Sequence, residues 1–350
     1  MREAEILTWL RQTDSPALAQ LYTAADRVRR ESVGDAIHLR GLVEVSNICR
    51  RECGYCGLRA PNHEVTRYRM TGGEVLACAR EAHSLGYGTV VLQAGESEGA
   101  IPGRWMACIV RAIKDATPLA VTLSLGERDE HDLAQWREAG ADRYLLRFET
   151  SDPELYARIH PPRHGTVSDR IAMLKALVRL GYEAGSGVMV GIPGQTYSTL
   201  ARDLMLFREL DLDMIGIGPY IPHPATPLGS GEWHSEAPAA EQVPNSEEMV
   251  YKTVALARLL CPHANIPATT ALATINTRSG RELGLMRGAN VVMPNLTPLA
   301  YRRYYEIYPN KVCISEQPSQ CGGCLNARIA AIGRTPGRGP GGRQRMAANV

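Results

Sequence analysis

Eight short apolar runs recur through the middle of the chain, and segments with helical periodicity separate them. The runs are Gly41–Ser46, Thr89–Gly95, Leu119–Gly126, Arg143–Glu149, Ser186–Ile192, Met214–Ile221, Asn265–Ala271 and Asn290–Asn295. Most are almost continuously apolar, which is typical of parallel strands buried on both faces of a sheet. Eight strand–helix units over roughly 250 residues predict a complete (β/α)8 barrel of the TIM type. A doubly wound parallel sheet is the alternative that this alternation leaves open.

Helical segments lie between the runs. Thr71 is suited to cap a helix over Thr71–Leu85, because Glu74 stands three residues later in the arrangement of a capping box. The other predicted helices are Arg128–Ala139, Ser168–Leu180, Ser198–Leu210 and Glu247–Leu260. The segment Pro222–Asn245 is rich in proline, glycine, serine and acidic residues, and its length favours a functional or flexible loop.

The repeat has an extension at each end. Residues 1–37 carry apolar residues at helical spacing, and we expect this helical extension to pack beneath or beside the barrel, which takes up residues 38–312. Residues 313–350 form a C-terminal segment with a second group of cysteines and a basic tail. The tail, 340–350, is rich in glycine and arginine, so we expect it to fray.

Composition excludes several classes of function. The net charge is +2, and the sequence has no basic stripe that would bind nucleic acid. No apolar run approaches the length of a membrane span, which argues against a membrane protein. The charged, amphipathic N-terminus lacks the apolar core of a signal peptide, which favours a cytoplasmic protein. Six of the nine cysteines cluster in two short motifs, and in a reducing compartment this pattern indicates metal ligation.

The first motif consists of Cys49, Cys53 and Cys56, with Tyr55 directly before the last cysteine. Three thiolates at the spacing C-x3-C-x2-C can bind three irons of a 4Fe–4S cluster and leave the fourth iron open to a small molecule. A zinc site with a fourth ligand is one alternative, and scattered structural cysteines are another. The spacing is uncommon for zinc, and no histidine or fourth cysteine lies close by in the sequence.

This motif resembles the signature of the radical S-adenosylmethionine (SAM) enzymes. The resemblance implies that the open iron chelates SAM, and that the reduced cluster cleaves SAM to methionine and a 5′-deoxyadenosyl radical. Residues at the carboxyl ends of the predicted strands, and in the loops and helices that follow them, then become candidates for the cofactor pocket. With Tyr55 they are Gln93, Gly95, Glu96, Thr122, Ser124, Glu149, Arg170, Gly191 and Ile192.

Two of these candidates have a chemical rationale of their own. The carboxylate of Glu149 can accept hydrogen bonds from two ribose hydroxyls, and the guanidinium of Arg170 can bind the carboxylate of SAM in bidentate geometry. Taken alone, a glutamate at a strand end is more often solvated or salt-bridged, and Arg170 is more often a surface residue of a helix.

Longer strings are similar to a narrower family, HydE, the radical SAM maturases of FeFe-hydrogenase. The strings are Arg67–Thr71, Val90–Glu96, Val121–Glu127, Gly140–Arg147, Gly216–Pro219 and Asn265–Thr270, and the resemblance extends over residues 35–345. It implies SAM contacts at Gln93, Thr122, Glu149 and Arg170, and a substrate cavity at Thr269, Thr270, Met293 and Tyr301. Phe148 stands where HydE proteins carry a histidine, and we assign it to the cavity as well.

The resemblance also implies a substrate and partners. HydE proteins receive a cysteine-bound iron carbonyl–cyanide complex from HydG and use the radical on it during assembly of the di-iron subcluster of the H-cluster. A reductant protein and the other hydrogenase maturases are the remaining expected partners. The alternatives are a HydE paralogue or a methylornithine-synthase-like enzyme that acts on a free small molecule, and a non-catalytic iron–sulfur carrier.

The second motif, Cys313, Cys321 and Cys324, has the spacing C-x7-C-x2-C. Some HydE proteins carry a matching triplet that holds an accessory iron–sulfur cluster at the protein surface. The resemblance therefore implies a second iron–sulfur cluster here, and an empty or partly filled site is the alternative.

Overall fold

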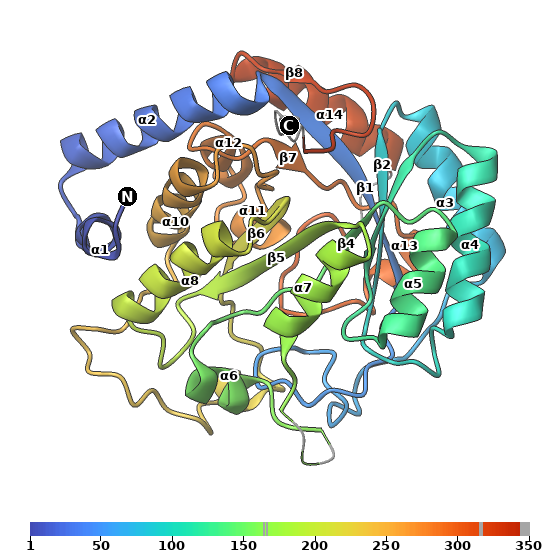
Figure 1. Cartoon of the computed structure of the whole chain (residues 1–350), viewed down its shortest axis with the longest axis horizontal. Coiled ribbons are helices and arrows are strands. Elements are labelled where there is room, and N and C mark those ends of the chain that lie inside the picture. Colours follow the sequence, from blue (N-terminus) through green and yellow to red (C-terminus); the bar gives the residue numbers. More distant parts are fainter. Residues whose placement is uncertain (164, 166, 315–317, 344–350) are drawn as a thin grey trace.

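Eight parallel segments form the wall of a closed barrel in the computed structural model (Figure 1). Seven of them are the strands β1 (Ala36–Ser46), β2 (Thr89–Ala94), β3 (Ala120–Ser124), β4 (Arg143–Leu145), β5 (Glu183–Val190), β6 (Met214–Pro219) and β7 (Val291–Val292). These strands pair in the order β6-β5-β4-β3-β2-β1-β7. The structure describes residues 1–163, 165, 167–314 and 318–343, with the backbone alone for 318–322.

The eighth segment, residues 265–268, joins the two edges of this sheet. Parallel bridges connect Met214 to Asn265 on one side and Pro267 to Val291 on the other. The backbone N–H of Ala268 donates to the carbonyl of Val291 at 2.9 Å. Pro267 has no N–H to donate, which explains why this segment makes isolated bridges instead of a continuous ladder. The predicted complete barrel is therefore confirmed, and the doubly wound alternative is excluded.

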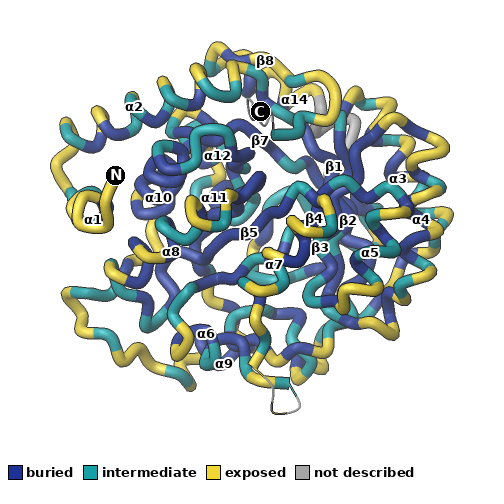
Figure 2. Tube along the Cα trace, viewed as in Figure 1, coloured by how far each residue is buried: buried dark blue, intermediate teal, exposed yellow. Residues whose placement is uncertain are grey.

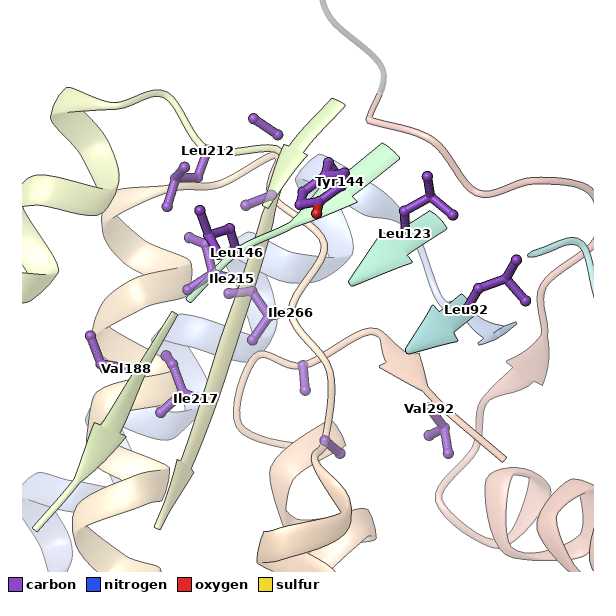
Figure 3. Packing of buried hydrophobic residues seen from close by; sticks show 14 of the residues in the cluster. Leu92, Leu123, Tyr144, Leu146, Val188, Leu212, Ile215, Ile217, Ile266 and Val292 are labelled. Carbon is purple, nitrogen blue, oxygen red and sulfur yellow. The ribbon is translucent and has the colours of Figure 1, made fainter. Parts of the chain in front are cut away.

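Side chains alternate between the two faces of the wall. On one face they form the apolar core that Figure 3 shows, which includes Leu92, Leu123, Tyr144, Leu146, Val188, Ile215, Ile217, Ile266 and Val292. Side chains on the other face of the same strands line the central cavity, among them those of Glu44, Gln93, Thr122 and Met189. Because successive side chains of a strand point to opposite faces, the wall can bury a continuous apolar layer and still present polar groups inside the barrel.

Helices surround the wall, with buried faces inward and exposed faces outward (Figures 1 and 2). They are α3 (Gly72–Ser84), α4 (Gly103–Ala116), α5 (Glu130–Glu138), α6 (Pro153–Ile159), α7 (Arg170–Arg179), α8 (Tyr197–Glu209), α9 (Pro227–Ser230), α10 (Glu247–Leu260), α11 (Thr270–Ile275), α12 (Gly280–Leu285), α13 (Leu299–Arg302) and α14 (Pro318–Ala331). The predicted capping box is present, since Thr71 Oγ1 accepts from Glu74 N at 3.3 Å and Glu74 Oε2 accepts from Thr71 N at 2.7 Å. The sequence did not predict α4, which begins without a side-chain cap.

The N-terminal extension forms α1 (Glu3–Arg11) and α2 (Ser15–Val33), which lie beside the barrel along α8 and α10 (Figure 1). The buried ammonium of Lys252 on α10 donates to the carbonyl of Leu10 at 3.2 Å, so it satisfies a carbonyl at the end of α1. Of the two positions expected for this extension, the structure shows the one beside the barrel. No helix in the described part of the chain is both long and apolar enough to cross a membrane.

A C-terminal segment, residues 334–343, closes the amino-terminal end of the barrel. Its strand β8 (Thr335–Pro336) pairs in parallel with the first residues of β1. The carbonyl of Pro340 accepts from the guanidinium of Arg143 at 3.0 Å, and the carbonyl of Gly341 accepts from that of Arg40 at 3.0 Å. The expectation that the tail frays from residue 340 onward is therefore wrong for residues 340–343. Residues 344–350 lie outside the described part of the chain.

Candidate active site

The strand-end residues converge on one end of the barrel, as the parallel topology requires. A central cavity of about 340 Å³ opens there. The predicted residues that line it are Tyr55, Cys56, Gln93, Thr122, Ser124, Glu149, Arg170, Thr269, Thr270 and Met293. Its size falls within the range of pockets that enclose small molecules and cofactors.

The cysteine loop, residues 47–71, connects β1 to α3 at this end of the barrel (Figure 1). Backbone hydrogen bonds tie it to neighbouring segments beside each cysteine: Arg50 N to Glu96 O at 2.9 Å, Gly54 N to Ile159 O at 2.8 Å, and Gly57 N to Ile307 O at 3.0 Å. Each of the three donors directly follows a cysteine of the first motif. The backbone beside the three cysteines is therefore held by the loop after β2, the end of α6 and the loop after α13.

Two glycines let another segment approach the cysteine loop closely. A Cβ atom at Gly54 would lie 2.3 Å from the ring of Trp233, and one at Gly57 would lie 2.6 Å from the ring of His223. Both rings belong to Pro222–Asn245, for which the sequence favoured a functional or flexible loop. The structure shows that this segment packs directly on the cysteine loop.

Burial raises the pKa of all three thiols, and that of Cys56 to about 12. Cys56 and Cys49 raise the pKa of Cys53 further, because nearby thiolates repel one another. Without a metal these buried thiols are protonated, and a metal centre beside them would supply the positive charge that makes them thiolates.

The distances between the three sulfur atoms test whether one zinc ion could bind all three thiolates. Thiolates around one tetrahedral zinc ion lie on the order of 4 Å apart. Among the residues that the structure describes, the set of metal-ligating atoms that lie within 4.8 Å of one another comes from Glu96, Glu127 and His160, and it does not include the three thiols. At least one pair of the three sulfur atoms therefore lies further apart than the ligands of one zinc ion do.

Five polar atoms of residues that line the cavity are buried and make no hydrogen bond in the described part of the chain. They are Arg40 Nε, Thr122 Oγ1, Arg147 Nε, Glu149 Oε2 and Tyr220 Oη, and of these Glu149 Oε2 forms an ion pair with Arg147. Buried polar atoms are nearly always hydrogen-bonded in folded proteins. The wall therefore fits a polar ligand that has hydroxyl or amino groups, which both a ribose and an amino acid provide.

Glu149 has an unusual backbone conformation, with φ at +64°. A non-glycine residue in the left-handed region is uncommon, and such strain is often found at ligand sites. The Oε2 atom of Glu149 lies 3.1 Å from Nη2 of Arg147. Burial raises the pKa of Glu149, while Arg147 and Arg170 lower it. The pKa stays raised overall, and the two guanidinium groups partly offset the effect of burial, in the direction of the carboxylate form that can accept hydrogen bonds from a ligand.

The turn after Glu149 is held by the buried carboxyl of Asp203 on α8, whose Oδ1 accepts from Ser151 N at 2.6 Å. Burial raises the pKa of Asp203 to about 7, against the opposing effect of the Ser151 hydrogen bond. The folded protein therefore binds this proton more tightly than the unfolded chain, and its contribution to stability is lost as the pH rises from about 4 to 7. Its other charged neighbours are Arg202 and Asp152.

Asp203→Asn is expected to raise the free energy of unfolding at pH 8 by about 2–4 kcal/mol, because the charged form no longer has to be buried. At pH 4 the variant and the parent protein should unfold at similar denaturant concentrations. Denaturant unfolding at both pH values measures the effect, and the exposed Asp115→Asn serves as the control. A variant that is no more stable than the parent protein at pH 8 contradicts the prediction.

Arg170 lies at the first residue of α7, where its guanidinium lines the cavity and also joins a buried ionic network. Its Nε donates to Glu127 Oε1 at 2.8 Å, and its Nη1 donates to the carbonyl of Arg147 at 2.7 Å. Arg51 of the cysteine loop lies 2.7 Å from Glu96, and it also contacts Glu127. The guanidinium groups of Arg51 and Arg170 thus neutralise the carboxylates of Glu96 and Glu127. These carboxylates therefore carry no net negative charge that would bind a metal cation.

Glu96 and three other candidates for the cofactor pocket contact the protein instead of lining the cavity. Glu96 pairs with Arg51 as described above. Gly95 packs under the cysteine loop, where a Cβ would lie 2.5 Å from the carbonyl of Ile48. Gly191, at φ +83°, donates its N–H to Gln195 at 2.7 Å, and Ile192 is fully buried in an apolar cluster. These four residues therefore stabilise the loops around the cavity without lining it.

Two candidates for the substrate cavity lie elsewhere. The ring of Phe148 is buried against Phe207 of α8, with the ring centroids 5.6 Å apart. Tyr301 donates its hydroxyl to Glu74 at 2.8 Å and stacks on Tyr68. The backbone N–H of Phe148 donates to Ser186 Oγ of β5 at 3.1 Å, and Phe148 is not among the residues that line the cavity. The expectation that Phe148 and Tyr301 line the cavity is therefore corrected.

Sequence reasoning missed the polar residues at the deeper wall of the cavity. Glu44 and Lys311 form an ion pair there, and Lys311 also donates to the carbonyl of Tyr305 at 3.1 Å. Arg40 lines the cavity near its amino-terminal end. Glu44 is the one charged residue in the first apolar run, GLVEVS, and this exception to the pattern could have marked it. Lys311 lies in a loop with no such signal.

The second cysteine motif is described only in part. Cys313 has φ at +66°, and its sulfur accepts from Arg281 Nη2 at 3.3 Å. Cys324 lies exposed on α14. The side chain of Cys321 lies outside the described residues, so the second cluster stays a prediction.

Sequence comparison with known proteins shows to which family the chain belongs. Residues 43–207 match the model of the Radical SAM superfamily. The [FeFe] hydrogenase maturase subunit HydE of Thermotoga maritima is 46% identical over 330 residues, which cover 94% of this chain and 90% of that protein. The chain belongs to the HydE family.

Other relatives of this HydE-family chain are more distant. The 3-methylornithine synthase of Methanosarcina barkeri is 29% identical over 85% of this chain and 80% of that protein. The crystal structure of methylornithine synthase (PylB) has a TM-score of 0.78 and 24% identity, and the match covers 96% of this chain and 94% of that chain. This likeness shows a shared barrel fold.

Membership of the HydE family makes the chain a radical SAM enzyme, which uses a 4Fe–4S cluster and SAM. The cysteines of the first motif fit this cluster in number and in spacing. The carrier hypothesis is thereby excluded. Thr122 Oγ1, which makes no hydrogen bond in the described part of the chain, and Glu149, whose Oε2 pairs with Arg147, lie in the same cavity as Tyr55 and Cys56 of the cysteine loop and fit a bound SAM molecule.

Proposed function

We propose that this chain is a maturase of FeFe-hydrogenase and acts on a small cysteine-bound iron carbonyl–cyanide complex during assembly of the di-iron subcluster. The observation that carries this proposal is the 46% identity to HydE of T. maritima over nearly the full length of both chains. The cavity supports it, because a volume of about 340 Å³ beside the cysteine loop can enclose a small molecule.

In this proposal Cys49, Cys53 and Cys56 hold the cluster. When bound, the cluster and SAM supply an electron and a 5′-deoxyadenosyl radical. Glu149 accepts hydrogen bonds from the ribose hydroxyls, and Thr122 pairs with a polar group of SAM. Arg170 holds the network behind the pocket, and its position in the cavity wall also allows it to face the carboxylate of SAM.

The substrate takes up the deeper part of the cavity, between Thr269, Thr270 and Met293. Gln93 stands near both ligands, and its amide donates to Tyr305 Oη at 3.1 Å, which fixes its orientation. The guanidinium of Arg147 offers a positive charge to the anionic groups of the substrate. The closed wall excludes water and other hydrogen donors while the radical is present.

The proposed role requires several partners. HydG supplies the substrate, a reductant protein supplies the electron, and the other hydrogenase maturases receive the product. Cys313, Cys321 and Cys324 hold an accessory iron–sulfur cluster in this proposal. Cys313 and Cys324, the two whose side chains the structure describes, are not among the residues that line the cavity.

The proposal is tested by anaerobic reconstitution of the cluster, followed by reduction with dithionite in the presence of SAM. We expect the synthetic cysteine-bound iron carbonyl–cyanide complex to be consumed and to increase the rate of 5′-deoxyadenosine formation. A set of free amino acids, tested in the same way, should be left unchanged. Modification of a free amino acid in place of the iron complex would overturn the maturase role in favour of a methylornithine-synthase-like enzyme.

A further inference from the structure

One side chain connects the two ends of the first cysteine motif. The guanidinium of Arg67 donates to the carbonyl of Asn47 at 2.8 Å and to the carbonyl of Leu58 at 2.8 Å. Asn47 stands two residues before the first cysteine, and Leu58 stands two residues after the last one. The span between these two carbonyls therefore contains all three proposed ligands of the cluster.

The same guanidinium makes two further hydrogen bonds within the loop. Its Nη2 donates to the carbonyl of Arg59 at 2.9 Å and to the carbonyl of Asn62 at 3.0 Å. One planar group thus satisfies four carbonyls of a loop that has no regular secondary structure. An ammonium group has no rigid fork, so a lysine cannot reproduce this arrangement.

The charge of Arg67 acts at the cluster site as well. Its hydrogen bonds to the carbonyls of Asn47 and Leu58 hold the positive charge against backbone that lies two residues from Cys49 and two residues from Cys56. No carboxylate in the described part of the chain forms a salt bridge with Arg67. The nearby Arg51, in contrast, is balanced by Glu96 and Glu127.

A cluster becomes more negative when it takes up an electron. Positive charge beside its thiolates stabilises the reduced form, and local charge and hydrogen bonding are the means by which proteins set cluster potentials. An unbalanced guanidinium at this place therefore makes the cluster easier to reduce.

We propose that Arg67 is a positioning residue that fixes the cysteine loop in its ligand-binding form and raises the reduction potential of the cluster. The proposal rests on cluster binding by the first cysteine motif. It concerns the backbone of the loop and the electrostatics of the site, and it assigns Arg67 no contact with SAM or substrate.

The two parts of the proposal are separated by two variants. Arg67→Lys keeps the charge and loses the fork, whereas Arg67→Met loses both. Arg59→Met is the matched control, because Arg59 lies in the same loop and its guanidinium makes one long bond of 3.3 Å to the carbonyl of Glu52. Circular dichroism and thermal unfolding establish that each variant is folded.

The first readout is the rate at which an iron chelator removes the reconstituted cluster. We expect both Arg67 variants to lose iron at least about tenfold faster than the parent protein, since the loss of even one or two net hydrogen bonds corresponds to such a factor. Arg59→Met should lose iron at the rate of the parent protein. Equal rates in the parent protein and both Arg67 variants would overturn the positioning role.

The second readout is the midpoint potential of the cluster, from a redox titration monitored by electron paramagnetic resonance without SAM. We expect a more negative potential in Arg67→Met and a nearly unchanged one in Arg67→Lys. A parent-like potential in Arg67→Met, or an equal shift in both variants, would overturn the electrostatic part. If Arg67→Met retains too little cluster to titrate, a negative shift in Arg67→Lys still overturns it. A parent protein that binds no cluster would instead refute the proposed function.

Discussion

Cys53→Ser is expected to reduce SAM cleavage to the level of a protein without a cluster. Cys53 is the most deeply buried of the three thiols and lies between the other two in sequence. A serine hydroxyl is a harder and far less acidic ligand than a thiol, so it does not replace the thiolate at iron. The measurement is the yield of 5′-deoxyadenosine after anaerobic reduction with SAM, together with the iron content of each sample.

The control for this prediction is Cys108→Ser, which removes an exposed thiol on α4. It should retain both the iron content and the SAM cleavage of the parent protein. Replacement of Cys313, Cys321 and Cys324 by serine should also leave SAM cleavage largely intact, because the described side chains of Cys313 and Cys324 do not line the cavity. Measurable cleavage by a cluster-free Cys53→Ser protein would falsify the role assigned to the first motif.

The second large effect concerns the ion pair inside the barrel. Lys311→Met should lower the free energy of unfolding by about 3–5 kcal/mol, because it leaves the carboxylate of Glu44 buried without its partner. Glu44 is only 1% exposed, and its remaining contacts are Asn295 Nδ2 at 3.1 Å and Thr297 Oγ1 at 3.4 Å. Lys311 also joins the loop after α13 to β1, so its loss loosens the deeper wall of the cavity.

A double variant distinguishes the ion pair from the general effect of losing a lysine. Glu44→Gln combined with Lys311→Met removes both charges and should recover most of the lost stability, since a glutamine can still pair with Asn295 and Thr297. Lys175→Met on the exposed face of α7 is the control and should change stability little. Denaturant unfolding of all four proteins at pH 7 provides the comparison. Equal stability of the single and double variants contradicts the explanation.

The barrel could be predicted from the sequence because its strands are apolar runs that recur in step with helices. The residues at which strand pairing stops were harder to predict, because the local backbone decides them. The fourth run, Arg143–Glu149, forms a ladder only as far as Leu145, and the chain then turns so that Glu149 reaches a positive φ. The seventh run makes isolated bridges because Pro267 interrupts the ladder. Neither effect appears in a pattern of apolar residues.

The site was predicted best where a residue belongs to a short motif, and least well where distant segments meet. The spacing of Cys49, Cys53 and Cys56 in the sequence was enough to predict a cluster site. Lys311 could not be found in this way, because its partner Glu44 is 267 positions away in the chain. The outward position of Phe148 could not be predicted either, because the chain leaves the ladder at Leu145 and the strand alternation no longer applies. In the structure its ring contributes to the packing against α8 and not to the lining of the cavity.

The segment at residues 334–343 has a consequence for how the chain folds. It pairs β8 with the first residues of β1, so the two partners are separated by nearly the whole barrel in sequence. Contacts of such long range form slowly, and during synthesis they cannot form until residues 334–343 have left the ribosome. Until that moment the carbonyls of Pro340 and Gly341 cannot accept from Arg143 and Arg40, so this end of the barrel stays open. Closure of the barrel at that end is thus a late step of folding.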